Sequence, residues 1–294
     1  MNRVVAIVSG GAAGGRAPAR AEPYLARIPS VVVRPTTGPG HATALAREAR
    51  EDGVDAVIAV GGDGTLFEVL NGLLPGSGPG KGPALGILPL GTGNSFVRDV
   101  GLGDADAGLA AILAGRTRPV DVLRIEHDGG EAYSINLVSL GFTADAGDLV
   151  NRKYKRMGVA GYVTAVMSSL VELRYHAFPH SLDDGPFDAR PVTMLSLCNS
   201  RYTGGAMMMA PGADPSDGYL DVIRIGTMRR RRLLSSFPKI FRGTHLEMTE
   251  VETRRARSVA FAPTGEVPVM VDGEVLPMAV RRVSVVPGAV ELLA

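Results

Sequence analysis

The chain has 294 residues and a formal net charge of +1, with 45% hydrophobic and 21% charged residues. This composition is that of a globular protein with room for two domains, and the near-neutral charge excludes a dedicated nucleic-acid-binding protein. The single cysteine, Cys198, cannot form an internal disulfide, and no segment has the roughly 18 consecutive apolar residues of a membrane span, so a cytoplasmic protein is expected.

Short apolar strands and helical stretches alternate over the first 118 residues. We expect strands at Val4–Val8, Ser30–Val33, Ala56–Val60 and Ala84–Leu88. Helices are expected at Ala42–Glu51 and Leu66–Leu74, and a third helix, capped by Asp104, runs to Ala114. Because this alternation is typical of a parallel sheet with helices on its faces, residues 1–118 are expected to form an α/β domain.

A glycine-rich turn, Gly61-Gly62-Asp63-Gly64-Thr65, directly follows the third of these strands. Thr65 and Glu68 have the spacing of a capping box, which predicts that a helix begins at Thr65. A glycine turn at a helix N-terminus suits phosphate, because backbone N–H groups are uncovered there. An exposed carboxylate at Asp63 adds a candidate contact to a metal ion or a ribose-phosphate group, while an ordinary strand–turn–helix corner stays the alternative.

The fourth strand leads into a second glycine-rich loop, Pro89-Leu90-Gly91-Thr92-Gly93-Asn94-Ser95, which opens a short helix. The two loops follow the carboxyl ends of two strands expected in one sheet. Loops at that edge of a parallel sheet can converge on one ligand. The sequence therefore predicts a binding site between them.

After Arg118 the pattern changes to strands separated by Gly, Pro and Asp turns, with helices inserted near Val159–Leu173 and Leu233–Phe241. We expect a β-rich, sandwich-like domain over residues 119–294. Its strands are expected at Val120–Ile125, Tyr133–Leu140, Val192–Cys198, Tyr219–Ile225, Ser258–Phe261, Val267–Val271 and Arg281–Val286.

Two Asp-Gly pairs and one methionine run in this domain each allow two interpretations. Asp272-Gly273 and Asp217-Gly218 are strong turn signals, and spacing alone favours a hairpin at Asp272 over a functional carboxylate. The run Met207-Met208-Met209 suits core filling better than the lining of a lipid pocket.

Taken in order, the two glycine loops and several later motifs resemble the catalytic domain of the diacylglycerol and sphingosine kinase superfamily. Its soluble bacterial lipid kinases are the most similar group. The first loop alone is shared with NAD kinases and phosphofructokinases, whereas the ordered set is specific. The later motifs are Asn136–Phe142, Gly204-Gly205, Pro211–Ala213, Asp217–Asp221 and Asp272–Glu274.

The resemblance implies an NAD kinase/phosphofructokinase-like first domain, ATP in the cleft and a lipid hydroxyl as acceptor. Asp272 is then the general base. A Mg²⁺ site with a structural role is implied at Asp217, with help from backbone carbonyls near Asp214 and Tyr219. The residues implied to hold the nucleotide are Thr36, Gly61, Gly62, Asp63, Gly64, Thr65, Glu68, Gly91, Thr92 and Asn94.

The loop after the first strand, Val4–Val8, departs from the family pattern. The family usually has Asn-Pro where this chain has Ser9-Gly10-Gly11. Whether that loop contacts ATP is therefore left open.

We expect an ATP- and Mg²⁺-dependent lipid kinase that phosphorylates a hydroxyl of diacylglycerol or a related lipid. The alternatives are a NAD kinase-like enzyme with a soluble acceptor and a non-catalytic regulator that binds nucleotide or lipid. The sequence leaves the acceptor lipid and the oligomeric state open, a homodimer included.

A basic run, Arg229–Arg232, leads into apolar residues at helical spacing from Leu233 to Phe241, with Pro238 expected to interrupt the helix. Packing against the sandwich is the ordinary explanation. The alternative is peripheral docking on the anionic inner face of a membrane, with the basic residues toward the lipid headgroups.

Overall fold

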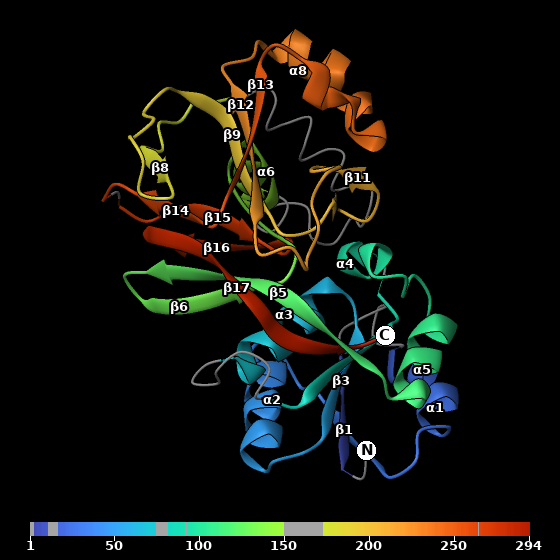
Figure 1. Cartoon of the computed structure of the whole chain (residues 1–294). Coiled ribbons are helices and arrows are strands. Elements are labelled where there is room, and N and C mark those ends of the chain that lie inside the picture. The colour runs from blue at the N-terminus through green and yellow to red at the C-terminus, as the bar shows by residue number, and fades with distance from the viewer. Residues whose placement is uncertain (1–2, 11–16, 75–81, 92, 150–172, 264) are drawn as a thin grey trace.

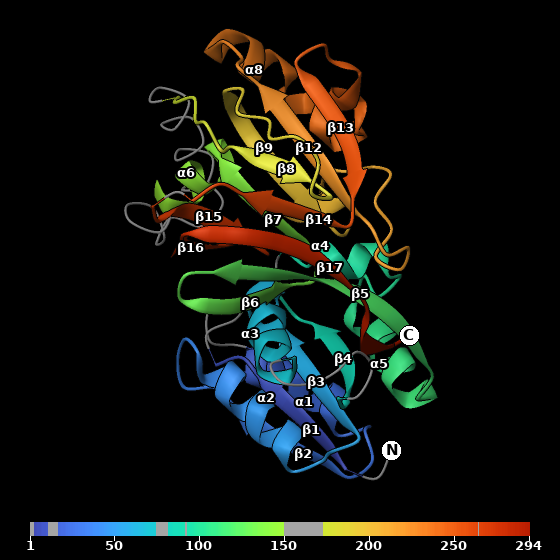
Figure 2. The ribbon, with the colours of Figure 1, turned by 60° about the vertical axis from the view of Figure 1, so that its left-hand side comes forward.

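The structure is a computed structural model that describes residues 3–10, 17–74, 82–91, 93–149, 173–263 and 265–294. Figures 1 and 2 show an α/β region and a β-rich region, with the long strand β17 running from one into the other. Thr92 and nearly all of the helix expected at Val159–Leu173 lie outside the described residues. Within the described part of the chain, no helix is long and apolar enough to cross a membrane.

The α/β region contains the four parallel strands that were expected, and their spatial order is β2-β1-β3-β4. The strands are β1 (Val4–Val8), β2 (Val31–Pro35), β3 (Ala56–Gly61) and β4 (Ala84–Pro89). The helices are α1 (Ala17–Leu25), α2 (His41–Glu51), α3 (Asp63–Leu73), α4 (Ser95–Asp99) and α5 (Ala105–Ala114). The predicted cap is confirmed, because the Asp104 carboxylate accepts a 2.8 Å hydrogen bond from the N–H of Ala107.

Helices cover both faces of this sheet, which explains why its strands read as uninterrupted apolar runs. In β1, Val5 and Ile7 face a core that contains residues of α2 and α3. Val4 and Ala6 face a second core that contains residues of α1 and α5. The carboxyl ends of the strands and the loops that follow them are left as one uncovered edge.

The β-rich region is a sandwich, which confirms the expected fold class. One sheet continues from the α/β region through β17 (Val280–Leu293), which pairs with β4, β5 (Thr117–His127) and β14 (Ser258–Phe261). Its outer strands are β6 (Gly130–Ser134) and β8 (His180–Leu182). The second sheet is antiparallel and consists, in spatial order, of β13 (Val251–Ala256), β12 (Leu220–Gly226), β9 (Val192–Cys198), β7 (Leu137–Gly141), β15 (Val267–Val271) and β16 (Glu274–Met278).

Shorter elements complete this region. They are β10 (Tyr202–Thr203), β11 (Met207–Met208), the helices α6 (Phe142–Leu149) and α8 (Arg230–Ser236), and the 3₁₀ helices η4 (Phe237–Arg242) and η5 (Thr244–Glu247). Pro238 does interrupt the helix, because α8 ends at Ser236 and the chain continues as 3₁₀. Cys198 is free, as expected, and it is buried.

The strand β17 joins the two regions. Leu292 pairs in parallel with Leu85 of β4 and packs in the core that holds α2 and α3. Leu293 packs in the core on the opposite face. The sheet of the α/β region is therefore completed by residues that lie beyond the expected boundary at 118.

One predicted strand is wrong. Tyr133–Leu140 was expected to be continuous, but it divides into β6 and β7, which belong to different sheets. The N–H groups of Ile135 and Asn136, between the two, donate to the carboxylate of Asp272 instead of to a neighbouring strand. A long-range contact, invisible in the local pattern, thus turns the chain from one sheet into the other.

Candidate active site

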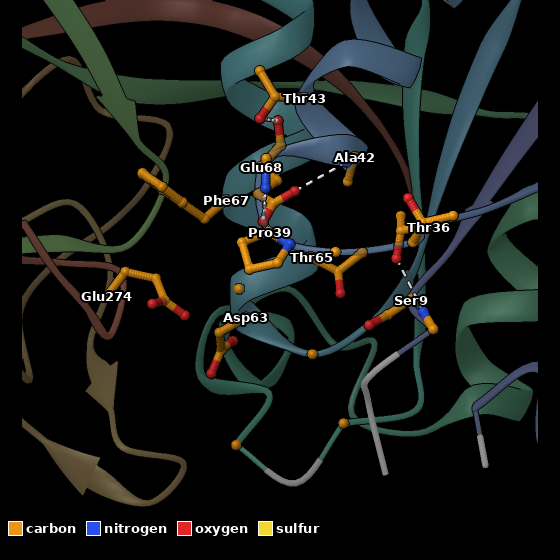
Figure 3. Close-up of a pocket in the computed structure, with 18 of the residues that line it drawn as sticks. Ser9, Thr36, Pro39, Ala42, Thr43, Asp63, Thr65, Phe67, Glu68 and Glu274 are labelled. Carbon is orange, nitrogen blue, oxygen red and sulfur yellow. Dashed lines mark hydrogen bonds between the residues drawn. The ribbon is translucent and has the colours of Figure 1, made fainter. Parts of the chain in front are cut away.

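A pocket of about 940 Å³ lies at the uncovered edge of the α/β sheet, where the loops after β1, β2, β3 and β4 meet (Figure 3). Seven predicted nucleotide-binding residues line it: Thr36, Gly62, Asp63, Gly64, Thr65, Glu68 and Gly91. Two others lie outside the lining: Gly61 and Asn94. The pocket therefore forms where convergence of the two glycine loops was expected.

The two glycine loops touch each other directly. The N–H groups of Leu90 and Gly91 donate to the carbonyl of Gly61, at 2.9 and 3.0 Å. A Cβ on Gly91 would lie 2.4 Å from Cα of Gly62, closer than side chains tolerate. Asn94, with a positive φ of 50°, donates from its side chain to the carbonyl of Gly91 at 2.9 Å. Gly61 and Asn94 thus hold the two loops in place through these hydrogen bonds, although neither residue lines the pocket.

The predicted capping box is wrong, because α3 begins at Asp63 with Gly62 as its N-cap. The Glu68 carboxylate reaches across to α2, where its two oxygens accept from the N–H groups of Gly40 and Ala42 at 2.9 and 3.0 Å. Glu68 therefore caps α2 instead of its own helix. It thereby fixes the loop after β2 against α3 at the side of the pocket (Figure 3).

Asp63 is half-buried rather than exposed, which corrects the expected free carboxylate. The N–H of Ser95 donates to both of its oxygens, at 2.9 and 3.2 Å, and the Ser95 hydroxyl adds a 3.3 Å bond. Burial raises the pKa of Asp63 above its ordinary value, although the Ser95 bonds oppose that shift. Asp63 therefore ties the start of α3 to the second glycine loop while still lining the pocket.

The loop after β1 does reach the pocket. Ser9 and Gly10 line it, and the N–H of Gly10 donates to the Thr36 hydroxyl at 3.0 Å. A Cβ on Gly10 would lie 2.4 Å from the carbonyl oxygen of Thr36. The glycine therefore permits the close approach that brings this loop to the site.

Glu274 is a site residue that was singled out only as part of a motif. It extends from β16, across the pocket from the N-terminus of α3 (Figure 3). A Cβ on Gly64 would lie 2.9 Å from a Glu274 carboxylate oxygen. The β-rich region thus contributes a carboxylate, together with Leu276 of the same strand, to a pocket otherwise formed by the α/β region.

Asp272 forms the predicted hairpin turn with Gly273, and both residues have positive φ, of 50° and 95°. Its carboxylate is 5% exposed. It accepts from the Ser134 hydroxyl at 2.5 Å and from the N–H groups of Ile135, Asn136 and Leu137 at 2.9, 3.0 and 3.0 Å. Burial raises the pKa of Asp272 to about 6, against the opposing effect of these bonds.

A second pocket, of about 280 Å³, lies in the β-rich region beside α8 and η4. Its lining is largely apolar and includes six methionines: Met194, Met207, Met209, Met228, Met248 and Met270. Two members of the Met207–Met209 run therefore line a cavity, although the sequence favoured core filling for this run. Gly273 lines this apolar pocket, whereas its neighbour Glu274 lines the larger one.

The residues expected to hold a structural Mg²⁺ ion are arranged differently. Asp217 pairs with Arg255, whose guanidinium also lies 4.6 Å from the centre of the Tyr219 ring. Asp214 accepts from the Ser216 N–H and hydroxyl at 3.0 and 2.6 Å. A guanidinium on the carboxylate opposes a bound cation, and no group of three acidic, His or Cys residues suited to a metal occurs in the described chain. The Asp217 carboxylate is therefore engaged by Arg255 in this structure. The Mg²⁺ site expected there, with backbone carbonyls near Asp214 and Tyr219, stays a prediction.

Comparison with known proteins connects both regions to one family. Residues 4–125 match the diacylglycerol kinase catalytic domain, and residues 136–294 match the YegS C-terminal NAD kinase beta sandwich-like domain. The chain is 34% identical over 266 residues to a protein named diacylglycerol kinase from Mycobacterium tuberculosis, covering 89% of this chain and 84% of the relative. It is 32% identical over 267 residues to a "Probable lipid kinase YegS-like" protein from Chromohalobacter salexigens, covering 90% and 84%.

A solved structure supports the same fold. The crystal structure of a diacylglycerol kinase from Bacillus anthracis superposes with a TM-score of 0.72 at 22% sequence identity. The match covers 99% of this chain and 96% of that one, so it extends over both regions.

Proposed function

The chain belongs to the diacylglycerol kinase catalytic domain family and is a kinase, and we propose that it transfers the γ-phosphate of ATP to a hydroxyl of diacylglycerol or a related lipid. One observation carries this proposal. The polar pocket and the apolar pocket are lined by consecutive residues of one β-turn, Glu274 and Gly273. A nucleotide in the first and a lipid chain in the second would bring phosphate and hydroxyl together at that turn.

The composition of the polar pocket favours a nucleotide that arrives with a divalent cation. Glycine loops and the N-terminus of α3 suit phosphate oxygens. Three lining residues are acidic, namely Asp63, Glu68 and Glu274, and none of the described lining residues is Lys or Arg. Because phosphoryl transfer requires the charge of the triphosphate to be neutralised, Mg²⁺ bound to ATP is the expected co-substrate.

We assign the general base to Asp272. A raised pKa near neutrality suits a group that must accept a proton from a hydroxyl. Its carboxylate sits directly before the two residues that line the pockets, and its four hydrogen bonds hold it in one orientation. The acceptor hydroxyl must reach this carboxylate. The apolar pocket favours this, because it is lined by Gly273 and would hold the lipid next to the Asp272-Gly273 turn.

The test of the proposed function is a transfer assay with radiolabelled ATP. The full chain is incubated with Mg·ATP and mixed micelles of diacylglycerol, ceramide, a sphingoid base or a glycolipid, and with NAD as a soluble acceptor. Label in one or more lipids is expected. Label in NAD alone would establish the NAD kinase-like alternative, and binding of nucleotide and lipid without transfer would establish the regulator.

Asp63→Ala is expected to weaken nucleotide binding by about 5- to 30-fold. The substitution removes the Ser95 bonds that hold the second glycine loop against the start of α3. Nucleotide binding must then order that loop again, at a cost of about 1–2 kcal/mol, the worth of the lost bonds. Isothermal titration calorimetry with Mg·ATP gives the dissociation constant. Asp106→Ala, which removes an exposed acid from α5, is the control, and equal affinities in both variants would mean that Asp63 has only a structural role.

We also propose that α8 and η4 bring the kinase to an anionic membrane. Arg229, Arg230 and Arg231 are exposed, whereas Arg232 pairs with Glu250 at 3.1 Å. Leu234, Phe237 and Phe241 are 42%, 37% and 49% exposed on the same segment. Phe237 also lines the apolar pocket, so a membrane held against this segment would lie at the pocket.

Changing Arg229, Arg230 and Arg231 together to Gln is expected to weaken binding to anionic vesicles by about 100-fold. Each basic residue near such a surface contributes about 1 kcal/mol, so three contribute about 3 kcal/mol. Vesicle co-sedimentation measures this, and activity on a short-chain soluble acceptor should be unchanged. The control changes three exposed arginines of the α/β region, Arg20, Arg47 and Arg116, to Gln, and an equal loss there would contradict the proposal.

A further inference from the structure

His245 is the unusual residue of the apolar pocket. It lies in η5, lines the pocket and is 5% exposed. Its Nε2 lies 3.0 Å from the carbonyl oxygen of Met209. Its Nδ1 is buried and has no hydrogen-bond partner. None of the roles proposed above uses this imidazole.

The bond to Met209 determines the tautomer. A carbonyl oxygen can only accept, so Nε2 carries the proton and donates it. Burial lowers the pKa of His245, and the imidazole is therefore neutral near pH 7. In a neutral imidazole protonated on Nε2, Nδ1 is an acceptor with a free lone pair.

Two other polar side chains of the pocket are already satisfied. The Thr193 hydroxyl donates to the carbonyl of Gly226 at 2.7 Å and accepts from the Met228 N–H at 3.2 Å. The Ser236 hydroxyl donates to the carbonyl of Arg232 at 2.8 Å. Among the described residues that line the pocket, His245 alone has a buried side-chain nitrogen or oxygen without a partner. An unpaired acceptor buried in an apolar site destabilises the folded protein, and a ligand that donates a hydrogen bond to it removes that cost.

We propose that the apolar pocket selects lipids that carry a second hydrogen-bond donor, a hydroxyl or an N–H, which Nδ1 of His245 accepts. The first donor is the hydroxyl that is phosphorylated, so this inference rests on the proposed function. Diacylglycerol has one hydroxyl, and its ester groups only accept. Lipids with two free hydroxyls or with an amide N–H meet both requirements, and the pocket favours them over diacylglycerol.

Access to Nδ1 requires a small rearrangement, because the atom is covered in this arrangement of side chains. The methionines Met209 and Met248 line the same pocket, and unbranched thioether side chains move aside at low cost. A hydroxyl entering beside them gains the bond that the free pocket lacks. An apolar chain makes the same packing contacts and leaves Nδ1 unpaired.

The test is a binding measurement without nucleotide, which keeps it separate from the proposed kinase activity. Isothermal titration calorimetry compares 1-octanol with the series of octanediols whose second hydroxyl moves along the chain. At one position or two adjacent positions, the diol is expected to bind about tenfold more tightly than 1-octanol, a difference of about 1.4 kcal/mol. His245→Phe, which keeps a ring but removes the acceptor, is expected to abolish that preference.

Two controls make the outcome decisive. Met248→Leu changes the lining at nearly constant volume and should keep the diol preference. His245→Gln retains a side-chain acceptor and should keep part of it, which guards against a His245→Phe protein that fails to fold. If every diol binds no better than 1-octanol to the unchanged protein, or if the preference survives in His245→Phe, the inference is wrong, and Nδ1 is then satisfied by a buried water alone. Failure of phosphate transfer would not affect this result.

Discussion

Asp272→Asn is expected to lower kcat by about 10²- to 10⁴-fold, the usual contribution of a positioned general base. Nucleotide affinity should change little, because Asp272 does not line the polar pocket. The Asn-Gly pair preserves the hairpin turn. The amide of the new Asn side chain, however, places an NH₂ donor opposite the N–H of Ile135. That N–H then lacks an acceptor, which costs about 1–3 kcal/mol of folding stability. Transfer rate, nucleotide binding and thermal unfolding should therefore be measured together.

The pH dependence distinguishes a base from a purely structural carboxylate. With a pKa of about 6, the deprotonated base is present above that pH, so kcat/KM should fall as the pH drops through 6. Stability should run the other way. Because the folded-state pKa lies above the unfolded value, the contribution of Asp272 to folding is fully present below the unfolded pKa and is lost as the pH rises through 6.

Ser134→Ala supplies the matched test. The Ser134 hydroxyl bond lowers the pKa of Asp272, so its removal should move the acid limb of the activity profile to higher pH while leaving the carboxylate in place. A carboxylate that serves only to hold the turn would give no such shift. If instead the acid limb persists in Asp272→Asn and disappears in Glu274→Gln, the base is Glu274, the other carboxylate at the turn.

Gly91→Ala is expected to reduce turnover by about 10²-fold and to weaken nucleotide binding. The new Cβ would lie 2.4 Å from Cα of Gly62 and 2.9 Å from its nitrogen, and backbone atoms cannot move aside as a side-chain end can. The two loops must separate, and a displacement of about 1 Å at a reacting centre can cost that factor. Overpacking also costs about 1–3 kcal/mol of stability.

The measurement for Gly91→Ala is turnover and nucleotide affinity at a temperature where circular dichroism shows the variant to be folded. Gly103→Ala is the control, because its Cβ would meet no atom within 4 Å. Equal losses in the two variants would mean that the second glycine loop tolerates a side chain. Contact between the loops would then be unnecessary for the site.

Features set by neighbouring residues were predictable from the sequence. The Asp104 cap and the Gly115 end of α5 follow from side-chain and backbone chemistry within one helix. The Asp272-Gly273 hairpin follows from the preference of that pair for positive φ. The polar pocket was predictable because two glycine loops follow adjacent parallel strands.

Features set by contacts between distant residues were not predictable. Glu68 has the spacing to cap its own helix but binds the N–H groups of Gly40 and Ala42. The exposed carboxylate expected at Asp63 is instead bound to Ser95. Local propensity gives the kind of bond that such a side chain makes, but tertiary structure selects its partner.

The apolar pocket illustrates a third kind of limit. Met207 and Met209 face a cavity, yet nothing in a short methionine run distinguishes a filled core from a lined hollow. The unpaired Nδ1 of His245 is equally hidden in the sequence, because it depends on the absence of a neighbour. Only the packed structure shows which polar atoms lack partners.

The return of β17 to the first sheet has a consequence for how the protein is made and degraded. During synthesis, β1 to β4 emerge early, but the free edge of β4 stays uncovered until Leu292 has been added. An exposed strand edge invites wrong pairing, so this interval is when a chaperone would be most useful. Removal of β17 by proteolysis should reopen the same edge. It would disable both pockets, although no residue of β17 lines either one.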